Sequence, residues 1–203
     1  MIRYAITDRR LLDADEPTRS AALLALAKRW AAEQIDYIQL REKDPPIHEL
    51  EKLACAINAI LQAAGAKTRL LINSSVEAAL AANAAGVHLT TAPGQPTFAE
   101  IRERFASASR SPVISISCHT LEQVAHARHE QVDLILFGPV FGKTVAGADV
   151  SPAAGLEALQ AACKAAGDTP VLALGGVTAA NTASCLAAGA SGIAGIRLFA
   201  GNI

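Results

Sequence analysis

The sequence predicts an α/β fold, a (β/α)8 or TIM barrel, from three observations. Short apolar segments typical of buried parallel strands recur about every 25 residues and alternate with helical patterns, as repeated βα units do. No GxGxxG motif follows the first segment, so an open doubly wound sheet is the less favoured alternative. Glycines lie at the ends of the last two segments, where such barrels often bind phosphate. With 203 residues the chain is near the short end for this fold, and we expect one domain over residues 1–203.

Strands and helices are expected to alternate along the whole chain. The expected strands are Arg3–Ile6, Asp36–Leu40, Arg69–Ile72, Gly86–Leu89, Pro112–Ser117, Asp133–Phe137, Pro170–Leu174 and Gly192–Ile196. The clearest helical patterns are Pro17–Glu33, Pro46–Ala64, Val76–Ala84 and Leu121–His129. Ser74 or Ser75 is expected to cap the third of these helices and Thr120 the fourth. After the last strand, Leu198–Ile203 offers less than two helical turns, so we expect a short or truncated final helix.

The composition argues against several classes of protein. Hydrophobic residues make up 51% of the chain, enough for a large core. The net charge of −1 and the scattered basic residues point to neither nucleic acid nor a membrane as partner. The apolar runs are far shorter than the roughly 18 residues of a membrane span, and residues 1–8 are typical of a first strand rather than a signal peptide. The four cysteines form no CxxC pair, which predicts no zinc site and a reducing, cytoplasmic location.

Two glycine-containing turns are the strongest indication of a ligand site. VLALGG at 171–176 and GIAGIR at 192–197 each lead from an apolar strand into small residues. Gly175 and Gly176 leave backbone N–H groups uncovered, and Thr178 is expected to cap the helix that follows. Such turns bind anions without a lysine, so we expect a small phosphorylated metabolite. The alternative is a tight strand-to-helix turn without a ligand.

Cationic and amide side chains follow other strands of the predicted barrel. Arg41 and Lys43 come just after the second strand and are expected to hold a carboxylate or phosphate, the alternative being a solvated charged loop. Asn73 follows the third strand and is a candidate donor to a ligand oxygen. Residues 138–152 form the longest loop, which we interpret as a mobile lid whose Lys143 and Thr144 reach the ligand.

His119 is the best candidate for a general acid and base. It lies between the fifth strand and the helix that Thr120 caps, with Gln123 placed to complete a capping box. A histidine titrating near neutral pH can both accept and return a proton. The alternative is a histidine that only hydrogen-bonds the next loop. His88 alternates within the fourth strand and is expected to be a buried core residue.

Six motifs then occur in the order found in one known family. They are TyrAlaIleThrAsp at 4–8, GlnLeuArgGluLysAsp at 39–44, AlaGlyValHisLeu at 85–89, CysHisThr at 118–120, PheGlyProValPhe at 137–141 and LeuGlyGlyValThr at 174–178. The chain resembles the thiamine phosphate synthase/TenI family of (β/α)8 barrels. The resemblance implies that Gly176, Gly195 and Ile196 hold a thiazole phosphate and that His119 is the acid and base of the tautomerase branch. It implies pyrimidine- or diphosphate-binding roles for Gln39, Arg41, Lys43, Asn73 and Ser117.

The departures from the synthase pattern favour the tautomerase branch, whose members aromatise a carboxylated thiazole phosphate by a proton shift. The synthase pattern has aspartates at two places that here read Asn73-Ser74 and ThrThrAlaPro at 90–93. Those carboxylates hold the Mg²⁺ that neutralises a diphosphate leaving group. We therefore expect an isomerase without cofactor or metal. Arg197, where the family has a small residue, is a further candidate phosphate ligand.

Two alternative functions and the oligomeric state stay open at this point. One is a synthase that joins hydroxymethylpyrimidine diphosphate to thiazole phosphate with Mg²⁺. Another is a non-catalytic regulatory protein of the pathway that binds a phosphorylated ligand. We also leave open whether the chain forms a homo-oligomer.

Overall fold

The computed structural model describes residues 1–12, 15–42, 44–145 and 148–201. Its strands are β1 (Ile2–Ile6), β2 (Tyr37–Leu40), β3 (Arg69–Asn73), β4 (Gly86–Leu89), β5 (Val113–Cys118), β6 (Leu134–Phe137), β7 (Lys143–Val145), β8 (Ala148–Ser151), β9 (Val171–Leu174) and β10 (Gly192–Gly195). Its helices are η1 (Arg9–Leu11), α1 (Glu16–Ala32), α2 (Ile47–Ala63), α3 (Val76–Ala81), α4 (Phe98–Ser107), α5 (Leu121–His129), α6 (Gly155–Ala166), α7 (Thr182–Ala187) and α8 (Arg197–Ala200).

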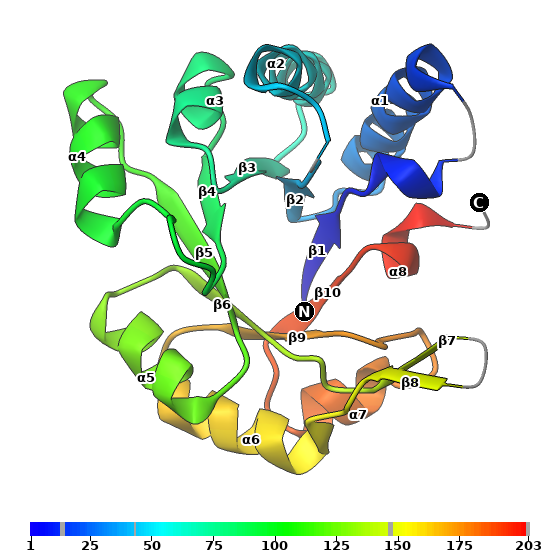
Figure 1. Ribbon diagram of the computed structural model, residues 1–203, viewed down its shortest axis with the longest axis vertical. Coiled ribbons are helices and arrows are strands. Elements are labelled where there is room, and N and C mark those ends of the chain that lie inside the picture. The colour runs from blue at the N-terminus through cyan, green and yellow to red at the C-terminus, as the bar shows by residue number, and fades with distance from the viewer. Residues whose placement is uncertain (13–14, 43, 146–147, 202–203) are drawn as a thin grey trace. The chain divides into compact units, whose positions relative to one another are not determined.

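The main sheet confirms the predicted fold class. It is a closed barrel with the strand order β1-β10-β9-β6-β5-β4-β3-β2 (Figure 1). Contacts divide the chain into two compact units. The α1–α4 unit comprises Tyr4–His88, Pro96–Val113 and the residues from Phe199 onward, and the α5–α7 unit comprises Met1–Arg3, Leu89–Gln95 and Ile114–Leu198. One domain over residues 1–203 stays a prediction.

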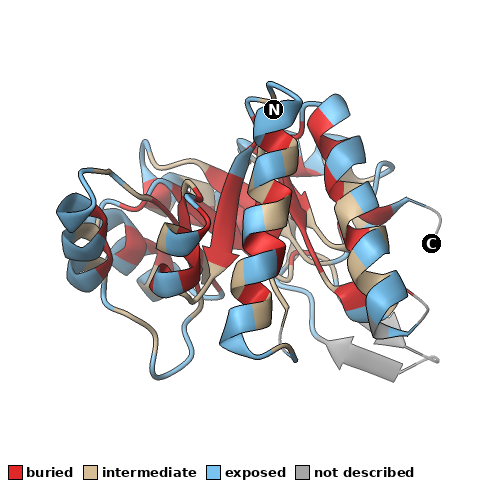
Figure 2. Ribbon diagram, turned by 90° about the horizontal axis from the view of Figure 1, so that it is seen from above, coloured by how far each residue is buried: buried red, intermediate tan, exposed pale blue. Residues whose placement is uncertain are grey.

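The α1–α4 unit is built from helices on the outer side of parallel strands (Figure 1). Ser75 caps α3 by accepting from the N–H of Ala78, as one of the two predicted serines. Gly86 must be glycine, because a Cβ there would lie 1.9 Å from the carbonyl oxygen of Val113. The largest fully buried side chains of this unit include Trp30, Tyr4, Phe105, Ile57 and Leu71. Figure 2 shows that buried residues fill the strands, whereas the helices also carry exposed residues.

The α5–α7 unit brings the carboxyl ends of four strands to one level. Cys118 of β5 pairs with Phe137 of β6, and Phe137 pairs with Ala173 of β9. Leu174 of β9 pairs in turn with Ala194 of β10. Because the register is this even, the segments that follow β5, β6, β9 and β10 start beside one another. These segments contain His119 and the two predicted glycine turns.

The expected lid at 138–152 differs from the structure. Two antiparallel strands, β7 and β8, occupy its second half, so the segment is not a loop without regular structure. Thr144 and Val145 are β-branched residues that suit a strand, and they pair with Asp149 and Ala148. No described helix is both long and apolar enough to cross a membrane.

Candidate active site

A pocket of about 470 Å³ lies at the carboxyl ends of β9 and β10. Its lining includes all the residues that the sequence proposes for phosphate binding, namely Gly175, Gly176, Gly195, Ile196 and Arg197. Apolar walls come from Pro139, Phe141, Leu174 and Val177. The pocket therefore has exposed backbone of the glycine turns on one side and apolar side chains on the other, which suits a small ring that carries an anionic group.

Close packing explains the two consecutive glycines. Gly175 and Gly176 have φ of +88° and +63°, a region that other residues rarely adopt. A Cβ on Gly175 would lie 2.5 Å from the Cβ of Pro139, and one on Gly176 would lie 2.6 Å from the Cβ of Phe141. The segment 138–141 is bonded to the same turn, because Val140 N–H donates to Leu174 O (2.8 Å) and Phe141 N–H donates to Gly175 O (3.0 Å).

Asn181, rather than Thr178, organises the turn after β9. The expected cap by Thr178 is wrong, because α7 begins only at Thr182. Asn181 reaches back instead: its Nδ2 donates to Gly176 O (3.0 Å) and its Oδ1 accepts from the N–H of Thr178 (2.8 Å). Within the described residues, the N–H groups of Gly176 and Val177 have no hydrogen-bond partner. They remain available to an anion in the pocket.

Arg197 adds a full positive charge to this pocket. It is exposed, lines the pocket, and pairs with no acidic side chain in the described part of the chain. A guanidinium with free donors can bind a phosphate in bidentate geometry. The pocket is therefore suited to an anion both by its backbone and by this side chain.

His119 is attached to the segment that forms one wall of the pocket. Its Nδ1 lies 2.5 Å from the carbonyl oxygen of Gly138, directly before Pro139. A carbonyl can only accept, so Nδ1 carries a proton and Nε2 is the basic nitrogen of the neutral ring. The main chain is also fixed, since His119 N–H donates to Gln123 Oε1 at 2.6 Å. Thr120 caps α5 as predicted, but Gln123 bonds His119 rather than closing a capping box on Thr120.

The neighbouring Cys118 does not compete with His119 for this chemistry. Cys118 is buried, and burial raises the pKa of its thiol to about 12. It is therefore a neutral core side chain at physiological pH. Ser117 is half-buried in β5.

The α1–α4 unit holds a second group of predicted residues. Gln39 Nε2 donates to Asn73 Oδ1 at 2.8 Å, and Asn73 Nδ2 donates to Ser74 Oγ at 3.1 Å. Gln39 is buried, and its Oε1 has no partner among the described residues. His88 is also buried, as predicted, with Nδ1 3.3 Å from the hydroxyl of Tyr4. Burial lowers the pKa of His88 to about 3, so this histidine is neutral.

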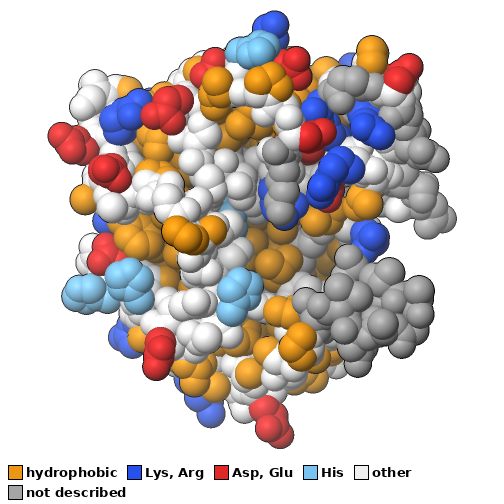
Figure 3. Space-filling view, viewed as in Figure 1, with side chains coloured by type: hydrophobic (Ala, Val, Ile, Leu, Met, Phe, Trp, Pro, Cys, Tyr) orange, Lys and Arg blue, Asp and Glu red, His pale blue; other side chains and the backbone are white. Residues whose placement is uncertain are grey.

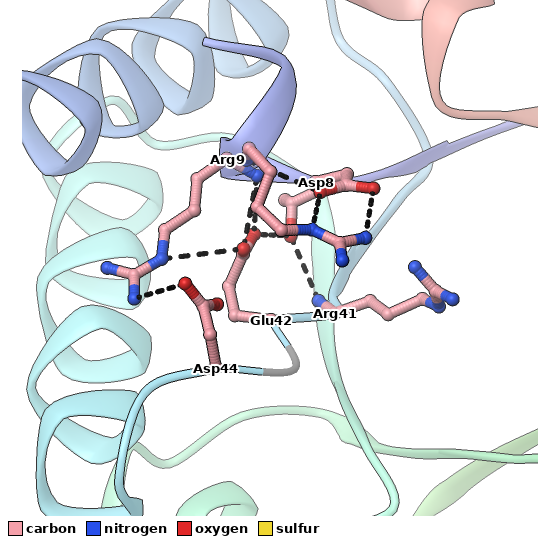
Figure 4. A network of polar contacts seen from close by, with 7 residues as sticks. Asp8, Arg9, Arg41, Glu42 and Asp44 are labelled. Carbon is pink, nitrogen blue, oxygen red and sulfur yellow. Dashed lines mark hydrogen bonds and ion pairs between the residues drawn. The ribbon is translucent and has the colours of Figure 1, made fainter. Parts of the chain in front are cut away.

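Arg41 lies beside a network of charged residues that the sequence reasoning gave no role (Figure 4). Figure 3 shows Lys and Arg side chains gathered with acidic ones at the upper right of that view. Arg9 pairs with Glu42 and Asp44, and Arg10 pairs with Asp8. The only sequence signal was that these residues follow the first two strands. Lys43 lies outside the described residues, and the side chains of Lys143 and Thr144, on β7, are not described.

Fold and pocket together define a (β/α)8 barrel with a glycine-lined pocket after its last two barrel strands. A family model described as thiamine monophosphate synthase matches residues 3–199. The chain belongs to this family of thiamine biosynthesis enzymes, which confirms the resemblance.

Individual relatives agree with the family assignment. A Geobacter sulfurreducens relative is 40% identical over 191 residues, which cover 94% of this chain and 83% of the relative. The thiamine-phosphate synthase of Methanocella arvoryzae is 35% identical over 193 residues, covering 94% and 83%. Among solved structures, the thiamine phosphate pyrophosphorylase of Pyrococcus furiosus matches with a TM-score of 0.73 and 26% identity, over 96% of this chain and 85% of that one.

Proposed function

We propose that this chain is a thiazole tautomerase, which aromatises the carboxylated thiazole phosphate by a proton shift at His119. The observation that carries the proposal is the bond between His119 Nδ1 and Gly138 O, next to the wall of the glycine-lined pocket. It fixes the tautomer in which Nε2 is basic. His119 is not itself among the lining residues, so a phosphorylated substrate in the pocket would have to extend past Pro139 to meet this histidine and transfer a proton to it.

The reaction needs only a proton carrier and a phosphate site. Nε2 takes a proton from the thiazole ring system, the electron pair moves into the ring, and the same proton returns to another atom of the substrate. Substrate and product have the same atoms and charge, so no leaving group has to be neutralised. The uncovered N–H groups of Gly176 and Val177, with Arg197, supply the phosphate contacts.

The residues present do not fit the Mg²⁺ of the synthase reaction. The two places where the synthase pattern has aspartates hold Ser74 and residues 90–93, which carry hydroxyl and apolar side chains. Mg²⁺ is usually bound by one or two carboxylates together with substrate phosphates. The amide of Asn73 is already engaged by Gln39 and Ser74.

The test compares His119→Ala with the matched control His129→Ala, which removes an exposed histidine from the end of α5. The substrate is the non-aromatic thiazole carboxylate phosphate in D₂O, followed by NMR, and phosphate binding is titrated separately. We expect His119→Ala to lose at least about 100-fold in turnover, the contribution of a positioned acid and base, while binding is nearly unchanged. An equal loss of binding and turnover, or no loss of turnover, would contradict the proposal.

The synthase is the second candidate, because the relative from Methanocella arvoryzae that carries this name is 35% identical over nearly the whole chain. It predicts thiamine phosphate from hydroxymethylpyrimidine diphosphate and thiazole phosphate when Mg²⁺ is added. Ligand binding without either reaction would instead indicate a regulatory binding protein.

A further inference from the structure

Glu42 is a buried acidic residue for which neither candidate reaction gives a reason. It follows β2, and its side chain is only 1% exposed. Thr7 Oγ1 donates to Oε1 at 2.5 Å, and the N–H of Arg9 donates to Oε2 at 3.1 Å. The guanidinium of Arg9 is 3.6 Å away. Burying a carboxylate costs free energy unless it is paired and hydrogen-bonded. The hydrogen bonds to Glu42 therefore compensate its burial, which distinguishes it from an exposed surface ion pair.

Thr7 connects Glu42 to Arg41 through two hydrogen bonds. The hydroxyl of Thr7 donates to the carboxylate, and its oxygen accepts from the backbone N–H of Arg41 at 2.9 Å. Thr7 is 1% exposed, so water cannot replace either bond. Both neighbours fix the direction of the hydroxyl, because a carboxylate accepts and an N–H donates. The backbone of Arg41 is thereby tied to the loop after β1.

The same network leaves the side chain of Arg41 without an ion pair to a described acidic residue. Arg9 pairs with Glu42 and also with Asp44, at 3.3 Å. Arg10 pairs with Asp8 at 2.9 Å. The guanidinium of Arg41 interacts with the charge of Asp8, but it makes no hydrogen bond or ion pair with a described residue, and Figure 4 shows it extending away from Glu42 and Asp44. All the acidic groups of this cluster are thus engaged by other arginines.

We propose that Thr7 and Glu42 are positioning residues for Arg41, which hold its backbone so that its guanidinium binds an anionic group of a ligand. The role of the pair is indirect: neither side chain has to touch the ligand. The proposal does not depend on whether the chain is a tautomerase or a synthase. It requires only that Arg41 contributes to binding a phosphate-type anion, which its free bidentate donors allow.

The experiment measures binding of inorganic pyrophosphate by calorimetry, without divalent cations, in a double-mutant cycle. The variants are Arg41→Ala, Thr7→Val and the combination of both. Thr7→Val keeps the shape of the side chain but removes the hydroxyl, and the conservative control Thr7→Ser keeps it. Thermal unfolding of every variant separates a loss of binding from a loss of structure.

We expect Arg41→Ala and Thr7→Val each to weaken pyrophosphate binding about tenfold, and Thr7→Ser to stay within about twofold, since only the hydroxyl bridge matters. In the double variant the loss should equal that of Arg41→Ala alone, because Thr7 acts through Arg41. A folded Thr7→Val that binds as the wild type does, losses that multiply in the double variant, or wild-type binding by Arg41→Ala would overturn the proposal. If Thr7→Val does not fold, we use Glu42→Asp in its place in the same cycle. This substitution draws the carboxylate back from Thr7, and the expected results are the same.

Discussion

Replacing His88 should change how the stability of the protein depends on pH. The imidazole is buried in β4, 2% exposed, with Nδ1 facing the hydroxyl of Tyr4 at 3.3 Å. Burial, aided by the charge of Arg41, lowers its pKa to about 3 from an ordinary value of 6.5. His88→Asn keeps an oxygen able to accept from Tyr4 near the position of Nδ1, but it removes the titrating group.

The size of the effect follows from this pKa. In the unfolded chain His88 binds a proton as the pH falls below 6.5, whereas in the folded chain it stays neutral down to about 3. The unfolded state therefore binds more protons in this window, and stability present above pH 6.5 is lost as the pH falls. Between pH 7.5 and 5 the loss from this one group is about 2 kcal/mol.

Urea unfolding at several pH values measures the effect. Groups other than His88 titrate in both proteins, so the difference between wild type and His88→Asn isolates this residue. The variant should be less stable at pH 7.5 and should lose about 2 kcal/mol less than the wild type on going to pH 5. Parallel pH profiles of the two proteins would refute the inference that His88 is buried and neutral.

Three further predictions concern the glycine turn, the thiols and the cap of α3. Gly175→Ala should destabilise the fold by about 2 kcal/mol and abolish binding of inorganic phosphate, because its Cβ would meet Pro139 at 2.5 Å. Gly94→Ala, also at positive φ but in open space, should cost about 1 kcal/mol and leave binding intact; equal losses would contradict the packing argument. Iodoacetamide should modify the exposed Cys55 well before the buried Cys118, as mass spectrometry of peptides can show. Ser75→Ala should cost about 1 kcal/mol in a urea titration by removing the cap of α3, and an unchanged midpoint would argue against the cap.

Most of the fold could be predicted because each βα unit carries its own local signal. The expected strand Gly86–Leu89 and helix Leu121–His129 match β4 and α5 residue for residue. Buried parallel strands are continuous apolar runs. The helices between them begin after N-cap residues such as Thr120, which mark the first residue of the helix. The strands of the hairpin are short, with three residues in β7 and four in β8, so its pattern was weak.

The site was predictable where function depends on the backbone and unpredictable where it depends on side chains from distant segments. The consecutive glycines at 175 and 176 predict a turn, and in the structure both line the pocket. Asn181 was missed because nothing in the sequence distinguishes an asparagine that reaches back to Gly176 O from one that caps its own helix. The bridge from Glu42 to Thr7 joins residues 35 apart, and only the pairing of β1 with β2 brings them together.

An NMR assay of the purified protein with non-aromatic thiazole carboxylate phosphate in D₂O, without added metal, tests the proposed tautomerase activity most directly. A parallel sample contains hydroxymethylpyrimidine diphosphate and Mg²⁺. We expect aromatisation of the thiazole in the first sample and its loss in His119→Ala. Thiamine phosphate formed at an enzymatic rate in the second sample, with no aromatisation in the first, would contradict this expectation.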